Sequence, residues 1–524
     1  MKKPDQKNKS GFARSAGILL PVSSLPSPYG IGTFGKAAFR WVDFLRNSGQ
    51  TFWQILPLSP PGYGDSPYSS FSAFAGNPYF IDIDILYYEG LLSRKDFANI
   101  KWGSSDRRVD YEAIFANREN VLRKAFTKFK DDAALDEFAK QNPWAGDFGL
   151  YMAVKASQGG RSWTEWDEPL RMGQLEAVSW IREGLAEDIR YHIFTQYQFM
   201  KQWQVLHEYA NAKGVQIIGD IPFYVSMDSA DVWSDKGSFL INRNGLPTEV
   251  AGCPPDSFSE DGQLWGNPLY DWDAMAKTGY KWWVHRLKNS FELCDVIRID
   301  HFRGLESYFA IPNGATTAKD GVWKPGPGKD FISALKRALP GRSIIAEDLG
   351  YLTDEVRQLL EYSGYPGMKL LQFAFDTRVS ETEDYRPFTY SANTVVYPGT
   401  HDNETLSGWC KTAPRESIQK AMDYIGIKSR GSLPRSMIRL TMQSVSDLAI
   451  IPMQDWLELG SEARMNTPST LGGNNWRWRL EAKALTSRLT DSIAELTALY
   501  GRSPAKEKAS GKAENNNINA DETL

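Results

Sequence analysis

The segment DVIRID (295–300) is a short, β-branched apolar run that ends in an acidic residue, and it sets the pattern for the chain. Seven more apolar runs can be read as strands: GILLPV (17–22), TFWQILPL (51–58), VQIIGDIPFY (215–224), SIIAEDL (343–349), MKLLQFAF (368–375), NTVVYP (393–398) and LAIIPM (448–453). Near-continuous apolar runs are typical of strands buried on both faces of a parallel sheet. Eight of them predict an α/β fold, the (β/α)8 TIM barrel, with seven or nine strands as the alternative.

Helical patterns lie between several of these runs, for example at 330–339, 353–361 and 480–500. The chain has 524 residues, whereas such a barrel ordinarily needs about 250. We therefore expect one catalytic barrel over 15–502 with two large insertions at its C-terminal face. They are a mostly helical subdomain at about 59–214 and loops that cover the site at about 225–294. Residues 1–14 and 503–524 are polar and are predicted to be a flexible and a disordered tail.

The composition excludes several classes of protein. A net charge of −4 argues against a nucleic-acid partner, and no apolar run approaches the roughly 18 residues that a membrane span needs. The three widely spaced cysteines argue against a disulfide scaffold or a zinc site, so a reducing, cytoplasmic location is expected. Aromatic residues make up 13% of the chain, which fits either a large core or a surface that stacks sugar rings.

One familiar motif is rejected. Residues 30–35 read GIGTFG and match the G-x-G-x-x-G pattern of dinucleotide sites. However, seven residues with two prolines separate the first glycine from the strand, and no acidic residue ends the next strand to bind a ribose. These glycines are expected to shape a loop at the mouth of the barrel. No nucleotide or other cofactor is expected.

Acidic residues stand where the predicted strands end: Asp220, Asp300, Glu347 and Asp402, with His301 and His401 beside two of them. In a parallel barrel these ends share one rim, so the carboxyl groups are expected to converge there. The alternative is a set of structural caps and ion pairs. Paired carboxyl groups suit glycosidic chemistry, in which one attacks the anomeric carbon and the other protonates the leaving oxygen. Aromatic residues of the loops would provide sugar platforms: Tyr63, Tyr68, Phe258, Trp265 and Phe373.

Six segments together resemble the 4-α-glucanotransferase (amylomaltase, or disproportionating enzyme) family of the α-amylase clan. They are GYGDSPY (62–68), VAGCPPD (250–256), LWGNP (264–268), RIDHFRG (298–304), AEDLG (346–350) and THDNET (400–405). The resemblance runs from about Gly17 to Tyr500. It implies the same barrel without a C-terminal β-domain, and transfer of an α-1,4-glucan segment to the 4-hydroxyl of another glucan with retention of configuration.

The resemblance also implies roles for single residues. Asp300 matches the nucleophile, Glu347 the general acid/base and Asp402 the third carboxylate. Arg298 would keep Asp300 ionised. The remaining matches are positions that bind the glucan or support the site: Tyr63, Ser66, Asp220, Asp256, Trp265, Asn267, His301, Phe373 and His401.

The expected substrates are maltooligosaccharides, amylose and glycogen-type glucans, handled by a monomer or small homo-oligomer. Residues 220–225 lack the Asn-His pair with which α-amylases bind calcium, so no metal is expected. Two other functions stay open: a retaining hydrolase of α-1,4-glucans, and a catalytically silent glucan-binding relative. Transfer is favoured if the segment 250–267, with Trp265, folds over the site and excludes water.

Overall fold

A computed structural model describes residues 11–255, 260–350, 352–379 and 382–504. Its centre is a sheet of eight parallel strands in the order β10-β11-β12-β1-β2-β3-β6-β9. Their bounds are β1 (Ser15–Leu19), β2 (Phe52–Gln54), β3 (Gln216–Ile221), β6 (Val296–Ile299), β9 (Ser343–Ala346), β10 (Gly367–Leu370), β11 (Thr394–Tyr397) and β12 (Leu448–Pro452). Every predicted strand is present, and the predicted TIM barrel is confirmed.

The two ends of this order, β9 and β10, meet with little pairing. β6 and β9 share four residue pairs, whereas β9 and β10 share no ladder among the described residues. The backbone N–H of Ala346 donates to the carbonyl oxygen of Pro366 at 3.0 Å across this junction, which we call the seam. The barrel is therefore nearly closed.

Two strands are much shorter than their apolar runs. The run 51–58 forms a strand only over Phe52–Gln54, and the run 368–375 turns after Leu370. In the second case the N–H groups of Ala374 and Phe375 donate to carbonyl oxygens three residues back, so the chain coils instead of extending. Apolar composition predicts burial, but it does not distinguish a buried strand from a buried turn.

Eighteen α-helices lie in the described part of the chain. Their bounds are α1 (Lys36–Asn47), α2 (Ile83–Tyr88), α3 (Tyr111–Lys128), α4 (Asp132–Gln141), α5 (Pro143–Ser157), α6 (Glu168–Met172), α7 (Leu175–Gly184), α8 (Ala186–Ala212), α9 (Ala230–Ser234), α10 (Trp272–Lys277), α11 (Lys281–Leu293), α12 (Gly328–Ala338), α13 (Asp354–Ser363), α14 (Leu406–Thr412), α15 (Arg415–Ile425), α16 (Leu433–Gln443), α17 (Met453–Trp456) and α18 (Ser487–Leu499).

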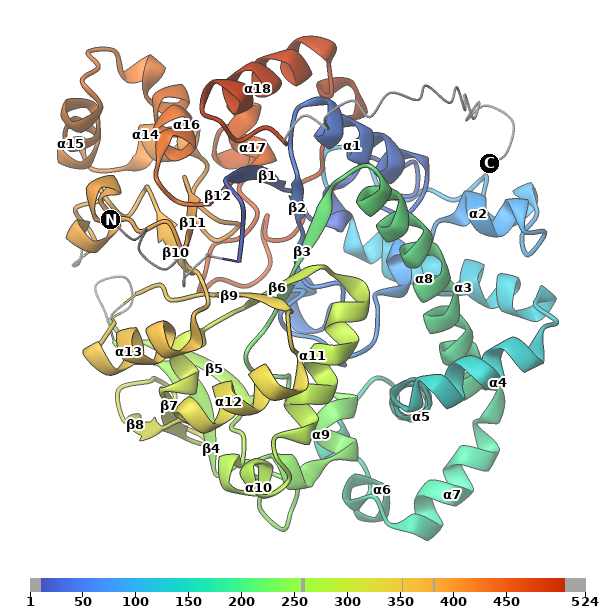
Figure 1. Ribbon diagram of the computed structural model, residues 1–524. Coiled ribbons are helices and arrows are strands. Elements are labelled where there is room, and N and C mark those ends of the chain that lie inside the picture. Colours follow the sequence, from blue (N-terminus) through green and yellow to red (C-terminus); the bar gives the residue numbers. More distant parts are fainter. Residues whose placement is uncertain (1–10, 256–259, 351, 380–381, 505–524) are drawn as a thin grey trace, which may run out of the picture.

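Helices α3 to α7 form a lobe at one side of the molecule (Figure 1). They belong to the segment 59–214, and α8, which ends that segment, packs along α5 and also contacts α1 and β3. None of the described helices combines the length and the apolar character that crossing a membrane requires.

A second, four-stranded antiparallel sheet was not predicted. Its order is β5-β4-β7-β8, with β4 (Glu249–Cys253), β5 (Gln263–Pro268), β7 (Ser307–Pro312) and β8 (Val322–Pro325). The segment 225–294, expected to consist of loops, thus holds two strands and the helices α9, α10 and α11. This sheet lies at the end of the molecule away from α18 (Figure 1).

Candidate active site

Asp300 follows β6 directly, and a buried guanidinium holds its carboxylate. Arg298 points into the barrel two residues earlier, and its Nη2 donates to Asp300 Oδ1 at 2.9 Å. Its Nη1 donates to both oxygens of Asp220 at 2.7 Å. Asp220 comes from β3, where it is the backbone partner of Arg298. One guanidinium therefore bridges two carboxylates at the ends of neighbouring strands.

Glu347 follows β9 and is fixed beside Asp300 by backbone contacts. Its N–H donates to Ile299 at 3.0 Å, which continues the pairing of β9 with β6. Its Oε2 accepts the N–H of His301, the residue after Asp300, at 2.7 Å, and its Oε1 accepts the N–H of Leu349 at 2.9 Å. The two carboxyl groups predicted to converge do lie together.

Burial raises the pKa of both groups, but not equally. Burial and the charge of Asp300 raise the pKa of Glu347 to about 8, although Arg298 and the two N–H donors oppose the rise. Burial raises the pKa of Asp300 to about 6, and here Arg298, in direct contact, is the main opposing influence. Because the guanidinium touches Asp300, the pair holds its shared proton on Glu347 at neutral pH.

Asp402 reaches the same site from the loop after β11. Its Oδ1 accepts from the side-chain amide of Asn466 at 2.6 Å and lies 3.4 Å from Nε2 of His401. The His401 ring stacks on Tyr68, with centroids 5.2 Å apart and planes at 10°. Tyr68 in turn donates to Asp220 at 2.7 Å. Asp402 is thus connected through His401 and Tyr68 to the charge cluster around Arg298.

Asp300 and Asp402 open into a cleft of about 710 Å³, whereas Glu347, half-buried beside Asp300, is not part of its lining. Eight predicted residues line it: Ser66, Tyr68, Trp265, Asn267, Asp300, His301, His401 and Asp402. Asp220 and Arg298 are buried and act on the cleft through Asp300. Two predictions are placed elsewhere, because Tyr63 is 76% exposed and outside the cleft lining, and Phe373 packs edge-on against Tyr385. Asp256 and Phe258 lie outside the described residues.

His301 lines the cleft with both its backbone and its ring held in place. Its backbone adopts φ = 50°, a left-handed conformation uncommon for a residue other than glycine, and this presents its N–H to Glu347. Its ring meets Trp265 edge-on at 5.0 Å. Burial lowers the pKa of the ring to about 4, so it is neutral, and its Nε2 is buried without a partner among the described residues. A neutral ring nitrogen in this position is suited to a sugar hydroxyl.

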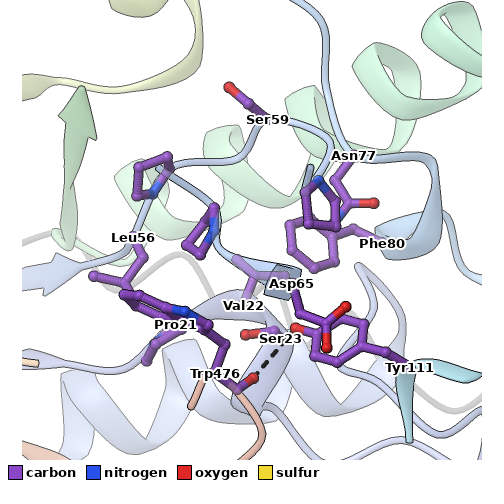
Figure 2. A pocket seen from close by; sticks show the side chains of 13 residues that line it. Pro21, Val22, Ser23, Leu56, Ser59, Asp65, Asn77, Phe80, Tyr111 and Trp476 are labelled. Carbon is purple, nitrogen blue, oxygen red and sulfur yellow. Dashed lines mark hydrogen bonds between the residues drawn. The ribbon is translucent and has the colours of Figure 1, made fainter. Parts of the chain in front are cut away.

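One part of the cleft lining was not predicted from the sequence. It is the loop after β12, which supplies Asn466, Ser469 and Trp476. Trp476 has φ = 64° and also borders a small cavity of about 20 Å³ on the other side (Figure 2). Its carbonyl oxygen accepts from the hydroxyl of Tyr111 at 3.2 Å, drawn as the dashed line. The only signal for this loop was its position after the eighth strand, at the rim where barrel sites form.

Among the described residues, no group of three or more His, Cys, Asp and Glu side chains is arranged to hold a metal ion. Two coupled carboxyl groups at adjacent strand ends of a (β/α)8 barrel, one ionised and one protonated, define the class of enzymes that act on glycosidic bonds.

The comparisons with known proteins agree. The model of the 4-alpha-glucanotransferase family matches residues 20–486. A 4-alpha-glucanotransferase of Clostridium butyricum is 46% identical over 92% of this chain and 99% of its own, and one of Thermus thermophilus is 44% identical over 89% and 95%. The structure of an amylomaltase from Streptococcus agalactiae in complex with acarbose superposes with a TM-score of 0.91 at 41% identity, covering 94% of this chain and all of its own. The chain belongs to the 4-alpha-glucanotransferase family, and it is a glycosyltransferase acting on α-1,4-glucans.

Proposed function

We propose that this enzyme transfers α-1,4-glucan segments by a retaining double displacement, with Asp300 as nucleophile, Glu347 as acid/base and Asp402 as the third carboxylate. The observation that carries the assignment is the unequal contact of the two carboxyl groups with Arg298. Asp300 touches the guanidinium at 2.9 Å and is held as the anion, whereas Glu347 accepts from two backbone N–H groups and keeps the proton.

The first displacement follows from this arrangement. An Asp300 oxygen attacks the anomeric carbon of the donor as the bond to the leaving 4-oxygen breaks, and Glu347 gives its proton to that oxygen. A covalent glucosyl ester on Asp300 results. In the second step Glu347, now a carboxylate, takes the proton of the acceptor 4-hydroxyl. That oxygen attacks the anomeric carbon and Asp300 leaves. Asp402, His301 and His401 bind sugar hydroxyls throughout.

Transfer requires that a sugar hydroxyl reach the ester before water does. Water is present at about 55 M, but well-oriented groups reach effective molarities of about 10⁵ M or more. Trp265 on β5, 37% exposed and packed edge-on against His301, is placed to stack an acceptor sugar next to the nucleophile. The Streptococcus agalactiae amylomaltase, solved in complex with acarbose, supports a carbohydrate ligand for this cleft. Maltooligosaccharides, amylose and glycogen-type glucans are the proposed substrates. A cytoplasmic location and a monomeric or small homo-oligomeric state remain predictions.

The test is incubation of the purified protein with maltotriose alone. Transfer gives a ladder of longer and shorter oligosaccharides at constant reducing-end concentration. Reducing ends that rise in step with donor consumption would instead indicate a hydrolase. Asp300→Asn should abolish turnover while leaving maltotriose binding measurable by calorimetry. Asp491→Asn, on the exposed face of α18, is the matched control and should change neither. Turnover near the wild-type rate in the Asp300 variant would refute the nucleophile assignment.

A further inference from the structure

The seam between β9 and β10 has a second connection besides its one backbone bond. The N–H of Met368, inside β10, donates to a side chain: Oδ1 of Asp348, at 2.6 Å. Asp348 lies just beyond β9 and is 5% exposed. At the corresponding places elsewhere in the barrel, backbone carbonyl groups of the neighbouring strand accept the N–H groups. A buried carboxylate thus replaces the missing part of the ladder.

Both ends of this bond lead to the proposed catalytic groups. On one side, Asp348 follows Glu347 directly in the chain. On the other side, the sulfur of Met368 accepts a hydrogen bond from Nε of Arg298 at 3.3 Å. The same guanidinium binds Asp300 through Nη2. The bond therefore fixes the strand end that carries the acid/base relative to the strand that orients the counter-ion of the nucleophile.

The neighbouring residue is fitted to this bond. A Cβ on Gly367 would lie 2.5 Å from Oδ2 of Asp348 and 2.8 Å from Oδ1, closer than real contacts allow. The backbone of Gly367 is not left-handed, so glycine is needed here for space rather than for conformation. Any side chain at this position pushes the carboxylate away.

The displaced carboxylate would have somewhere to go. A cavity of about 480 Å³ lies on the outer side of the seam and is lined by Asp348, Lys369 and Arg357 among others. Both cations act electrostatically on Asp348, while burial raises its pKa. A carboxylate displaced from Met368 could therefore move further into this cavity, towards Lys369 and Arg357.

We propose that Asp348 is a positioning residue, whose bond to Met368 closes the barrel at the seam and sets the placement of Glu347 against Asp300. This inference rests on the proposed roles of Glu347 and Asp300. It predicts that displacing the carboxylate lowers turnover without weakening glucan binding, because Asp348 does not line the substrate cleft.

Three variants distinguish the effect of the position of the Asp348 carboxylate from the effect of its charge. Gly367→Ala keeps every polar group and displaces the carboxylate. Asp348→Asn removes the charge and keeps an acceptor for Met368, and Asp348→Ala removes both. Gly146→Ala is the matched control, since a Cβ at that helical glycine meets nothing within 4 Å. Each is assayed for disproportionation of maltotriose between pH 4 and 10, with calorimetric binding of maltotriose and the thermal midpoint measured in parallel.

Misplacing a reacting group by about 1 Å costs up to about 100-fold. We expect kcat to fall roughly 10–100-fold in Gly367→Ala and Asp348→Ala, with KM and binding unchanged. Asp348→Asn should stay within roughly threefold, because a neutral bond of this kind is about half as strong as a charged one. The basic limb of the kcat/KM profile should move to lower pH in Gly367→Ala. Burial and the charge of Asp300 raise the pKa of Glu347, and Arg298 opposes this rise only in part. Moving Glu347 out of this arrangement therefore lowers its pKa.

The outcomes are separable. Wild-type kcat and an unchanged basic limb in Gly367→Ala and Asp348→Ala would overturn the proposal. Loss of maltotriose binding together with a collapsed thermal midpoint would also overturn it, by showing a purely structural role. Glu347→Gln is the reference: if it turns over normally, the proposed function fails, whereas an inactive Glu347→Gln with a normal Gly367→Ala refutes only the role of Asp348.

Discussion

Replacing Glu347 by glutamine should make the protein more stable at neutral and alkaline pH, and increasingly so as the pH rises. The pKa of Glu347 is raised from its ordinary 4.5 to about 8 in the folded protein, first by burial and then by the charge of Asp300. Between these values the folded state keeps a proton that the unfolded chain has lost. The contribution of this group is therefore fully present below pH 4.5 and is lost as the pH rises through about 8. A neutral glutamine has no such loss.

The size of the effect follows from the two pKa values. At about 1.36 kcal/mol for each pH unit that separates them, the ionisation of Glu347 costs at most roughly 4–5 kcal/mol at high pH. Glutamine recovers this cost but has one oxygen for two N–H donors, those of His301 and Leu349, so about 1–2 kcal/mol is forfeited. The net expectation at pH 9 is a gain of about 2–4 kcal/mol, and at pH 4.5 a small loss.

The assay is urea unfolding of wild type and Glu347→Gln at pH 4.5, 7 and 9, followed by tryptophan fluorescence. The difference in unfolding free energy between the two proteins should grow from slightly negative to clearly positive across this series. Glu416→Gln, whose side chain is 69% exposed on α15, is the control and should show no such trend. A difference that does not vary with pH would refute the raised pKa and, with it, the reason for choosing Glu347 as the acid.

Three further outcomes are expected. Trp265→Ala should raise hydrolysis relative to transfer by roughly 2–10-fold, because an aromatic contact is worth about 0.5–1.5 kcal/mol. The measurement is the ratio of glucose released to glucan transferred, and an unchanged ratio would refute the proposed role of Trp265 in acceptor binding. Asp220→Asn should move the acid limb of kcat/KM to lower pH, because the charge of Asp220 raises the pKa of Asp300; a limb that stays or rises would contradict this. Activity should survive a chelator, since the Asp220 carboxylate is already bonded to Arg298 and Tyr68; loss of activity that added calcium restores would show the opposite.

The barrel and its catalytic rim could be predicted because each depends on local pattern. An apolar run fixes a strand, and parallel strands in a barrel carry their carboxyl ends to one rim, so Asp300 and Glu347 had to approach each other. The antiparallel sheet could not be predicted in the same way. Its strands contain Gly252, Gly266 and Pro268 and show little alternation. Its central pairing joins β4 to β7, for example Val250 to Ile311, two segments far apart in the sequence.

The sequence also did not show which side chains of a segment face the cleft. Phe373 was expected to provide a sugar platform at the rim, but the chain turns after Leu370 and the ring packs on Tyr385. Tyr63 belongs to one of the six segments that together carry the family resemblance, yet it is exposed to solvent outside the cleft lining. A motif identifies which segment approaches the site, whereas which of its residues face the cleft depends on turns that the sequence pattern does not encode. Trp476 is the opposite case: it lines the cleft although it lies in none of the six segments.

Charge balance explains why the site needs this set of groups. Three carboxyl groups, Asp220, Asp300 and Glu347, surround one buried guanidinium, so full ionisation would leave an uncompensated excess of negative charge in a poorly solvated place. One proton must therefore remain, and it stays on the group that does not touch Arg298. Asp220, bonded to Arg298 and Tyr68, is buried outside the cleft lining, and its charge raises the pKa of Asp300. In this arrangement Arg298 sets the division of roles between Asp300 and Glu347, because it contacts Asp300 and lowers the pKa of that group against the opposing charge of Asp220.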